Sequence, residues 1–226
     1  MFSRTSKKPG HPTTSLVTAT KPTELSPLEA AIMDGCNLLH EVRASGNQAK
    51  ADEVRAHLFD LLDKYDASDA ENHPNPAWAR ANQRALAHSA AGEVEQAIIT
   101  ERIALRYADT DRRREISLGN LADRCLRIGR YDEAIEHFLE AQTVAPTSVP
   151  VMLTGAQALA LAGFPDEANR IFEGFLKDPA HLRPGTELVA YLEYEPRLGE
   201  LAAGLPALRT LKATWDRIKA QQPPQG

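Results

Sequence analysis

Two stretches, GRYDEAIEHF at residues 129–138 and GFPDEANRIF at residues 163–172, are partial copies of one another. They lie 34 residues apart and share Gly, Asp, Glu, Ala and Phe at five of their ten positions. A fixed interval of this length indicates a repeated supersecondary unit, because each copy of such a unit must bury an apolar face against its neighbour. The sequence around the two copies therefore decides the fold class.

The composition of the whole chain is that of a water-soluble protein. The chain has 226 residues, of which 42% are hydrophobic and 25% are charged, and its net charge is −5. No apolar run approaches the roughly 18 residues of a membrane-spanning helix. The negative charge argues against general nucleic-acid binding, which rests on clustered Lys and Arg. We therefore predict no membrane insertion, no nucleic-acid partner and no cofactor.

The two cysteines, Cys36 and Cys125, are far apart in the sequence and neither belongs to a CxxC pair. This pattern is typical of a reducing compartment, and we predict a cytoplasmic protein. Cys36 and His40 lie one helical turn apart, but no second pair of ligands accompanies them, so a core thiol beside a partly exposed histidine is the preferred interpretation. We predict no metal site.

The two ends of the chain differ in composition from the rest. Residues 1–25 are rich in Ser, Thr and Pro, contain no acidic residue before Glu24, and lack the apolar segment of a secretory signal peptide. Such a segment cannot bury enough apolar surface to become ordered, so we predict a disordered tail. The alternative is a leader that directs export through an unfolded N-terminus. Residues 222–226 are predicted to form a second disordered tail.

Between these tails almost every segment predicts a helix, and the helices come in pairs. Ser26 and Pro27 have the residue types of a helix cap and a first helical position. No run of alternating Val, Ile or Thr indicates a strand. Asp111 is a candidate cap for one helix, and Thr147 or Ser148 for another. The predicted helices cover about 27–44, 48–65, 76–91, 94–107, 111–128, 131–144 and 148–162, with a further helix from 165 and helical segments within 183–221.

The period near 34 and the residue types resemble those of tetratricopeptide repeats, which are helix–turn–helix units. Residues 115–148 match a full repeat. Gly129 ends the first helix, where a left-handed backbone suits glycine, and Pro146 prevents the second helix from continuing. Tyr131 and Phe138 fill the space between repeats. The remaining signature positions hold Leu118, Leu121, Ala122, Ala134 and Ala141.

The resemblance extends to both sides of this repeat with decreasing strength. Residues 149–182 keep four signature residues but have Pro165 in place of the aromatic residue, and residues 78–111 keep three and precede an insertion of about three residues. Residues 26–66 form either a degenerate repeat or only a similar helical hairpin. Residues 183–221 are predicted to cap the array. The matches are Ala156, Gly163, Ala168 and Phe172 in one unit and Gly92, Ala97 and Ala104 in the other.

This resemblance implies an all-α, right-handed superhelical solenoid of helix–turn–helix repeats with a C-terminal capping helix. In the family, the first helix of each pair supplies a concave wall that binds a peptide or helix of another protein. Amide side chains suit such a wall, since each can both donate to and accept from a bound backbone. The positions that correspond to the groove are Asn82, Gln83, Leu86, Gly119, Asn120, Asp123, Arg127, Leu153, Thr154 and Gln157.

A subset of the family clamps the C-terminal carboxylates of chaperones with groove cations, and this chain departs from that pattern. Asn120 is suitable, but a carboxylate held without the cations would be buried unpaired, which is costly. We expect no clamp of this kind. The positions of the clamp lysines hold Cys36, Ile116, Asn82 and Pro150.

The basic run Arg112, Arg113 and Arg114 is a candidate patch for an anionic partner. Three arginines at the start of a helix oppose its dipole, which suggests a role beyond helix formation. The alternative is ion pairing at the surface with the neighbouring Asp109, Asp111 and Glu115.

No sequence motif of catalysis is present: HExxH, a phosphate-binding Gly loop and a GxSxG elbow are all missing. We predict a non-enzymatic scaffold or adaptor, and this function is what the family resemblance implies. The alternatives are a scaffold that assembles with copies of itself and an exported bacterial effector or secretion chaperone.

Overall fold

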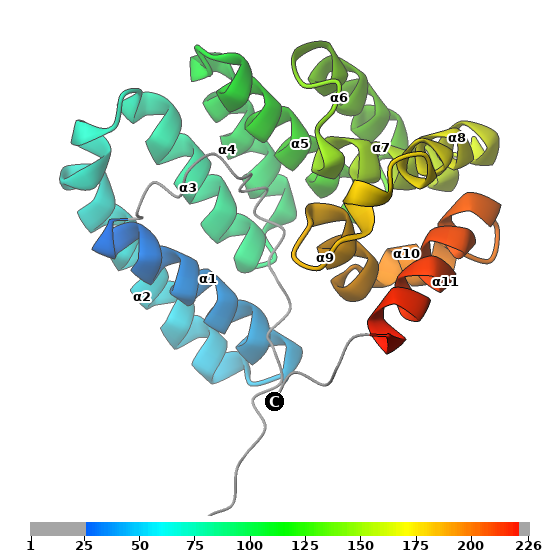
Figure 1. Cartoon of the computed structure of the whole chain (residues 1–226). Helices are drawn as coiled ribbons and strands as arrows, with labels where there is room; N and C mark the ends of the chain where they lie inside the picture. Colours follow the sequence, from blue (N-terminus) through cyan, green and yellow to red (C-terminus); the bar gives the residue numbers. More distant parts are fainter. Residues whose placement is uncertain (1–25, 222–226) are drawn as a thin grey trace, which may run out of the picture. The chain divides into compact units, whose positions relative to one another are not determined.

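The structure, a computed structural model, describes residues 26–221, and throughout this range it contains helices and no strand. The all-α prediction is therefore confirmed for the described residues. The chain divides into two compact units, one ending at Tyr107 and the other beginning at Ala108. Figure 1 shows the helices in sequence colours. The two predicted tails, residues 1–25 and 222–226, lie outside the described residues.

The first unit contains two pairs of helices. Helix α1 packs against α2, α3 packs against α4, and α3 also contacts both helices of the first pair. A short 3₁₀ turn, η1, joins the two pairs. The elements are α1 (Pro27–Ala44), α2 (Gln48–Ala67), η1 (Asp69–Asn72), α3 (Pro76–Ala90) and α4 (Val94–Tyr107).

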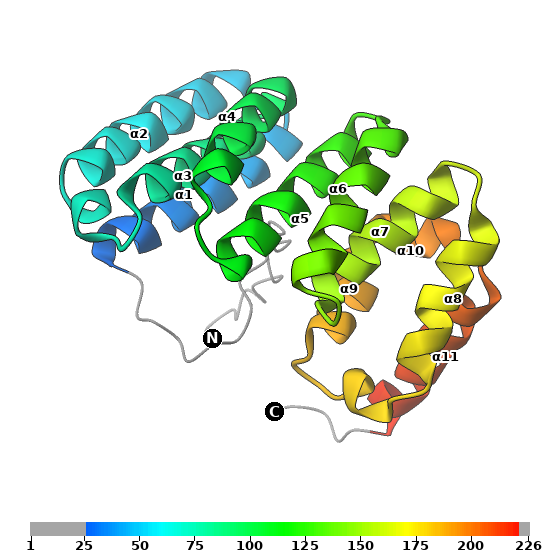
Figure 2. The ribbon, with the colours of Figure 1, turned by 90° about the horizontal axis from the view of Figure 1, so that it is seen from above.

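The second unit contains two further pairs and a C-terminal region, seen from above in Figure 2. Helix α5 pairs with α6 and α7 with α8, while α7 contacts both α5 and α6 and α11 packs on α8. The elements are α5 (Asp111–Arg127), α6 (Tyr131–Val144), α7 (Val149–Leu161), α8 (Pro165–Leu176), η2 (Pro179–Leu182), α9 (Glu187–Tyr194), α10 (Pro196–Leu201) and α11 (Pro206–Ala220).

Polar side chains cap several helices as their sequence predicts. Ser26 and Glu29 form a reciprocal capping box at the start of α1. Asn75 caps α3 by accepting the Trp78 backbone N–H at 3.0 Å. At α5 the prediction was wrong: the cap is Thr110, and Asp111 is the first helical residue. Thr110 lies one residue before Asp111, and its hydroxyl accepts a hydrogen bond from the backbone N–H of Arg113.

All four helix pairs turn on a glycine with a left-handed backbone. The φ angles of Gly46, Gly92, Gly129 and Gly163 are 75°, 77°, 76° and 92°. The second helix of every pair begins two residues after this glycine. At Gly129 the Arg130 N–H also bonds back to the Cys125 carbonyl, which completes a Schellman motif. The hairpin at residues 26–66 thus shares its turn conformation with the three that resemble repeats.

Close packing joins the two repeat-like pairs of the second unit. Phe138 on α6 is 3% exposed, and its ring lies so near Gly155 on α7 that an added Cβ atom would be 2.2 Å from it. The prediction that Phe138 fills the space between successive pairs is confirmed. Because Gly155 has no side chain, α7 can approach the aromatic ring this closely.

Helix α11 covers the apolar side of α8. Leu208, Leu211 and Trp215 are buried in one cluster with Phe172 and Phe175 of α8. The helical spacing of Leu208, Leu211 and Trp215 in the sequence already predicts that the three side chains share one apolar face of α11.

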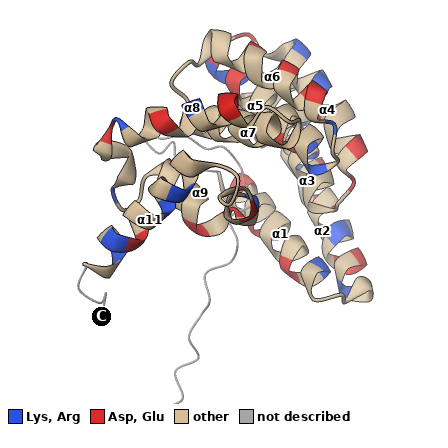
Figure 3. Ribbon diagram, turned by 90° about the vertical axis from the view of Figure 1, so that its right-hand side faces the viewer, with Lys and Arg blue, Asp and Glu red and all other residues tan. Residues whose placement is uncertain are grey.

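Charged residues are distributed over the surfaces of both units. Figure 3, a ribbon coloured by residue type, shows basic and acidic residues interspersed along individual helices. None of the helices that the structure describes combines the length and the apolar character needed to cross a bilayer.

Candidate functional site

Four of the predicted groove residues come together in the second unit. Asn120 and Asp123 lie on α5, Thr154 and Gln157 lie on α7, and these two helices pack together. The four residues are 6%, 8%, 2% and 0% exposed, respectively. Our expectation that Asn120 and Asp123 form an exposed wall is therefore wrong. Helices α9 and α10 lie against α7, and α10 also reaches Asp123 on α5.

Arg197 of α10 joins the C-terminal region to α5. Its Nη2 atom donates to Asp123 Oδ1 at 2.9 Å across 74 residues of sequence. The Nε and Nη2 atoms of the same guanidinium donate to the two carboxylate oxygens of Glu195, at 2.8 Å and 2.9 Å. Arg127, one turn along α5, places its Nε 2.8 Å from the other oxygen of Asp123. Asp123 is thus paired with one arginine of its own helix and one of α10.

The electrostatics of Asp123 follow from these two arginines. Burial would raise the pKa of the carboxyl group, because a charged group loses its hydration, but Arg127 and Arg197 outweigh burial and hold the pKa below its ordinary value. The carboxylate therefore stays charged at neutral pH. A buried anion of this kind requires cations, and Arg127 of α5 and Arg197 of α10 supply them.

Tyr191 of α9 lies next to the ion-paired Asp123, near Thr154 of α7. Its hydroxyl oxygen is buried near Thr154, with the carboxylates of Asp123, Glu195 and Glu187 around it. Burial and these three anions raise the pKa of the phenol well above its ordinary value. Tyr191 therefore remains a neutral hydrogen-bonding group.

Apolar side chains of α9 and α10 complete the contact. Leu188, Leu192 and Leu198 are at most 5% exposed and belong to one cluster with Leu153 and Ala156 of α7. The segment is thus anchored by leucines, while Tyr191 and Arg197 supply the polar contacts. Sequence reasoning predicted helix here but missed these roles, because residues 187–201 carry no repeat signature and their partners are distant in sequence.

The remaining predicted groove positions lie in the first unit, on α3. Asn82 is 7% exposed, whereas Gln83 and Leu86 are half-buried. Gln83 and Leu86 are therefore the predicted groove side chains of this unit that retain accessible surface.

The arginine run at the start of α5 is engaged in ion pairs. Arg112 contacts Glu115 at 2.5 Å and Arg113 contacts Asp109 at 2.6 Å. Arg114 is 3.9 Å from Glu140 of α6 and is about half exposed. These contacts favour the alternative of surface ion pairing over a free patch for an anionic partner.

Cys36 has the environment of a core thiol. It is 6% exposed, and burial raises the pKa of the thiol to about 12, so it is protonated at neutral pH. Across residues 26–221, no group of three or more His, Cys, Asp or Glu side chains is arranged to hold a metal ion.

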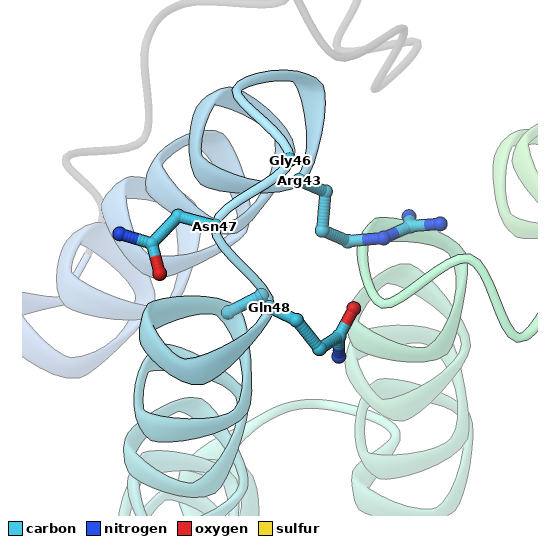
Figure 4. A pocket seen from close by; sticks show the side chains of 5 residues that line it. Arg43, Gly46, Asn47 and Gln48 are labelled. Carbon is cyan, nitrogen blue, oxygen red and sulfur yellow. The ribbon is translucent and has the colours of Figure 1, made fainter.

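A small pocket at the turn between α1 and α2 has a volume of about 190 Å³ and is lined by polar residues. Figure 4 shows Arg43 and Gln48 extending to the same side of this turn, while Asn47 points away. Ligand sites usually enclose about 300–1,000 Å³ and are mainly apolar. Arg43 instead has a structural contact, since its Nη1 donates to the Ala90 carbonyl at 2.9 Å.

In comparisons with known proteins, the chain matches no family model, no curated protein and no solved structure.

Proposed function

We propose that this protein is a non-enzymatic scaffold or adaptor of the tetratricopeptide type, which holds a peptide or helix of another protein against the first helices of its hairpins. The observation that carries the proposal is the common design of the four hairpins. Each turns on a left-handed glycine, and residues 115–148 and 149–182 have small and aromatic residues at the positions that the family uses for packing.

The chemistry of the α5 and α7 surface supports a role in binding a segment of chain. Buried polar side chains, among them Asp123, Thr154 and Gln157, lie there beside apolar residues such as Leu153. Such a mixture gives orientation and specificity to a segment that is otherwise held by apolar contact. Short helices lie against α7, since α9 and α10 both contact it, and α10 reaches Asp123 of α5 through Arg197.

Site-specific photo-cross-linking tests this proposal. A photoreactive residue replaces Gln83 on α3, the first helix of its pair, and as a matched control replaces the exposed Gln96 on α4, the second helix. Irradiation in a lysate of the source organism should link one partner protein through position 83 and not through position 96. Capture through position 96 alone would contradict a groove on the first helices. Recovery of only the protein itself would favour assembly with its own copies.

A further inference from the structure

We propose that helices α9 and α10 act as an internal ligand of the α5 and α7 surface, and that the external partner is a short amphipathic helix that replaces them. The partner would present a guanidinium group to Asp123, an aromatic hydroxyl to the neighbourhood of Thr154, and leucine-like side chains to α7. This inference rests on the proposed function for its external partner, whereas the internal contact is a property of the chain alone.

The polar contacts of the segment match those of a bound ligand. Arg197 reaches across to a carboxylate on α5, and Tyr191 places its hydroxyl over α7. These groups come from short helices of eight and six residues. Helices of this length are not stable by themselves, so α9 and α10 depend on the surface that they cover.

The contact leaves buried polar groups incompletely bonded. Arg197 Nη1 and the Gln157 Oε1 atom are buried without a hydrogen-bond partner in the described part of the chain. A buried donor or acceptor without a partner weakens the state that contains it. A segment with better-placed polar groups would therefore compete with α9 and α10.

Exposed loops flank the segment at both ends. Before α9, residues 183–185 are exposed and Gly185 has a φ of 82°; after α10, Ala203 and Gly204 are exposed. Helix α11 packs on α8 and also bonds to α9: Lys212 Nζ donates to the Leu192 carbonyl and Trp215 Nε1 donates to Glu193. Displacement of residues 187–201 thus moves two surface loops and breaks the bonds to α11 as well as the contacts with α5 and α7.

Peptide binding to the full-length chain tests the proposal. The probe is a fluorescent synthetic peptide with the sequence of residues 186–201, TELVAYLEYEPRLGEL. Wild type should bind the peptide weakly. Only molecules whose own segment has opened can bind it, and a small open fraction lowers the apparent affinity. Arg197→Ala removes the bond to Asp123 and should bind the peptide at least about tenfold more tightly. A second probe with Ala in place of its arginine should lose this gain.

Arg209→Ala is the matched control, since Arg209 is an exposed arginine of α11 in the same unit. It should bind the peptide as wild type does. Equal, weak binding by wild type and Arg197→Ala would overturn the proposal. If Arg197→Ala does not fold, as judged by circular dichroism, Arg197→Lys keeps the charge while losing the bidentate geometry. Arg197→Lys must then show tighter binding than wild type, or the proposal fails.

Hydrogen exchange of the wild-type protein provides a test without substitution. Amides of α9 and α10 should exchange at least about tenfold faster than those of α7 and α8, as expected of a locally opening segment. Equal rates would show that the segment opens only with the whole unit and would overturn the proposal.

The two proposals can fail separately. A partner captured through position 83 whose affinity is the same for wild type and Arg197→Ala would leave the scaffold function standing and overturn the internal ligand. Tighter binding of the synthetic peptide by Arg197→Ala than by wild type, with no partner captured at all, would support the internal ligand and contradict the scaffold function.

Discussion

At the scale of single residues, two positions in the second unit show how side-chain size and charge set the packing. Gly155 provides the space that the Phe138 ring fills. Asp123 provides the charge that Arg127 and Arg197 neutralise. The first is an apolar fit and the second is an electrostatic one. The loss of unfolding free energy caused by a substitution should therefore depend on pH at Asp123 and not at Gly155.

Gly155→Ala should destabilise the protein although alanine is the better helix former. The added methyl group meets the Phe138 ring at 2.2 Å, and overpacking of this kind costs about 1–3 kcal/mol. The gain in helix propensity is about 1 kcal/mol. Gly174→Ala on α8 is the matched control, since nothing lies within 4 Å of its added Cβ atom. Chemical denaturation should show a lower free energy of unfolding for Gly155→Ala and an unchanged or higher one for Gly174→Ala.

Asp123→Asn should destabilise the protein at neutral pH by about 1.5–3 kcal/mol, because Arg127 and Arg197 lose the buried carboxylate that pairs with both of them. The folded state holds the pKa of Asp123 below that of the unfolded state. The stabilising contribution is therefore complete well above the unfolded pKa of about 3.9 and is lost as pH falls through the folded pKa. Denaturation at pH 7 and at about pH 3 should show the gap between wild type and variant closing in acid. A gap independent of pH would mean that the carboxylate charge is not its source.

At the scale of elements, the helix boundaries follow from caps and glycines, and tertiary bonds reinforce them. The side chain of Asn75 caps α3 through its oxygen, while its Nδ2 donates to the Tyr107 carbonyl at the end of α4, at 2.7 Å. One side chain therefore fixes the start of α3 and links it to the last turn of its partner helix.

Two substitutions separate these roles of Asn75. Asn75→Asp keeps an oxygen for the cap but loses the donor to Tyr107, and should cost about 1 kcal/mol of unfolding free energy, as one hydrogen bond does. Asn75→Ala loses the cap as well and should cost about 1 kcal/mol more. Thermal and chemical unfolding of the two variants would measure both steps. Equal stability of the two variants would mean that the cap contributes nothing.

At the scale of the whole molecule, the question is whether the chain acts alone or with its own copies. An apolar stripe on α4, the second helix of its pair, bears on this question. Ile99, Ile103 and Tyr107 follow one another at four-residue spacing and are 52%, 41% and 51% exposed. Residues at this spacing share one helix face, and exposed apolar faces often mediate association.

If this stripe mediates self-assembly, sedimentation should show a mass that rises with concentration for wild type and stays monomeric for Ile103→Glu. Leu139→Glu is the control, because Leu139 is a similarly exposed apolar residue, 54% exposed, on α6 of the other unit. A monomeric wild type over the accessible concentration range would contradict self-assembly through this face and leave the adaptor as the proposed function.

The sequence by itself determined the local structure of this protein. The 34-residue interval, the four turn glycines and the spacing of residues such as Leu118, Leu121 and Phe138 were sufficient to predict paired helices, because these signals act within one hairpin or between adjacent ones. The predicted cap of α5, Asp111 for Thr110, differs by a single residue, within the usual uncertainty of helix ends. Ser148 holds its predicted cap position at α7 but makes no side-chain hydrogen bond there.

Only the tertiary structure decided what covers the predicted groove of the second unit. Arg197 and Asp123 are 74 residues apart, and no local pattern links an arginine in an unpatterned segment to one particular carboxylate. The contact depends on how the loops after α8 direct the chain back across α7, and loop direction is set by packing rather than by residue spacing. For this reason the sequence singled out polar positions on α5 and α7, while the fold determined that these positions are buried and that α9 and α10 lie against α7.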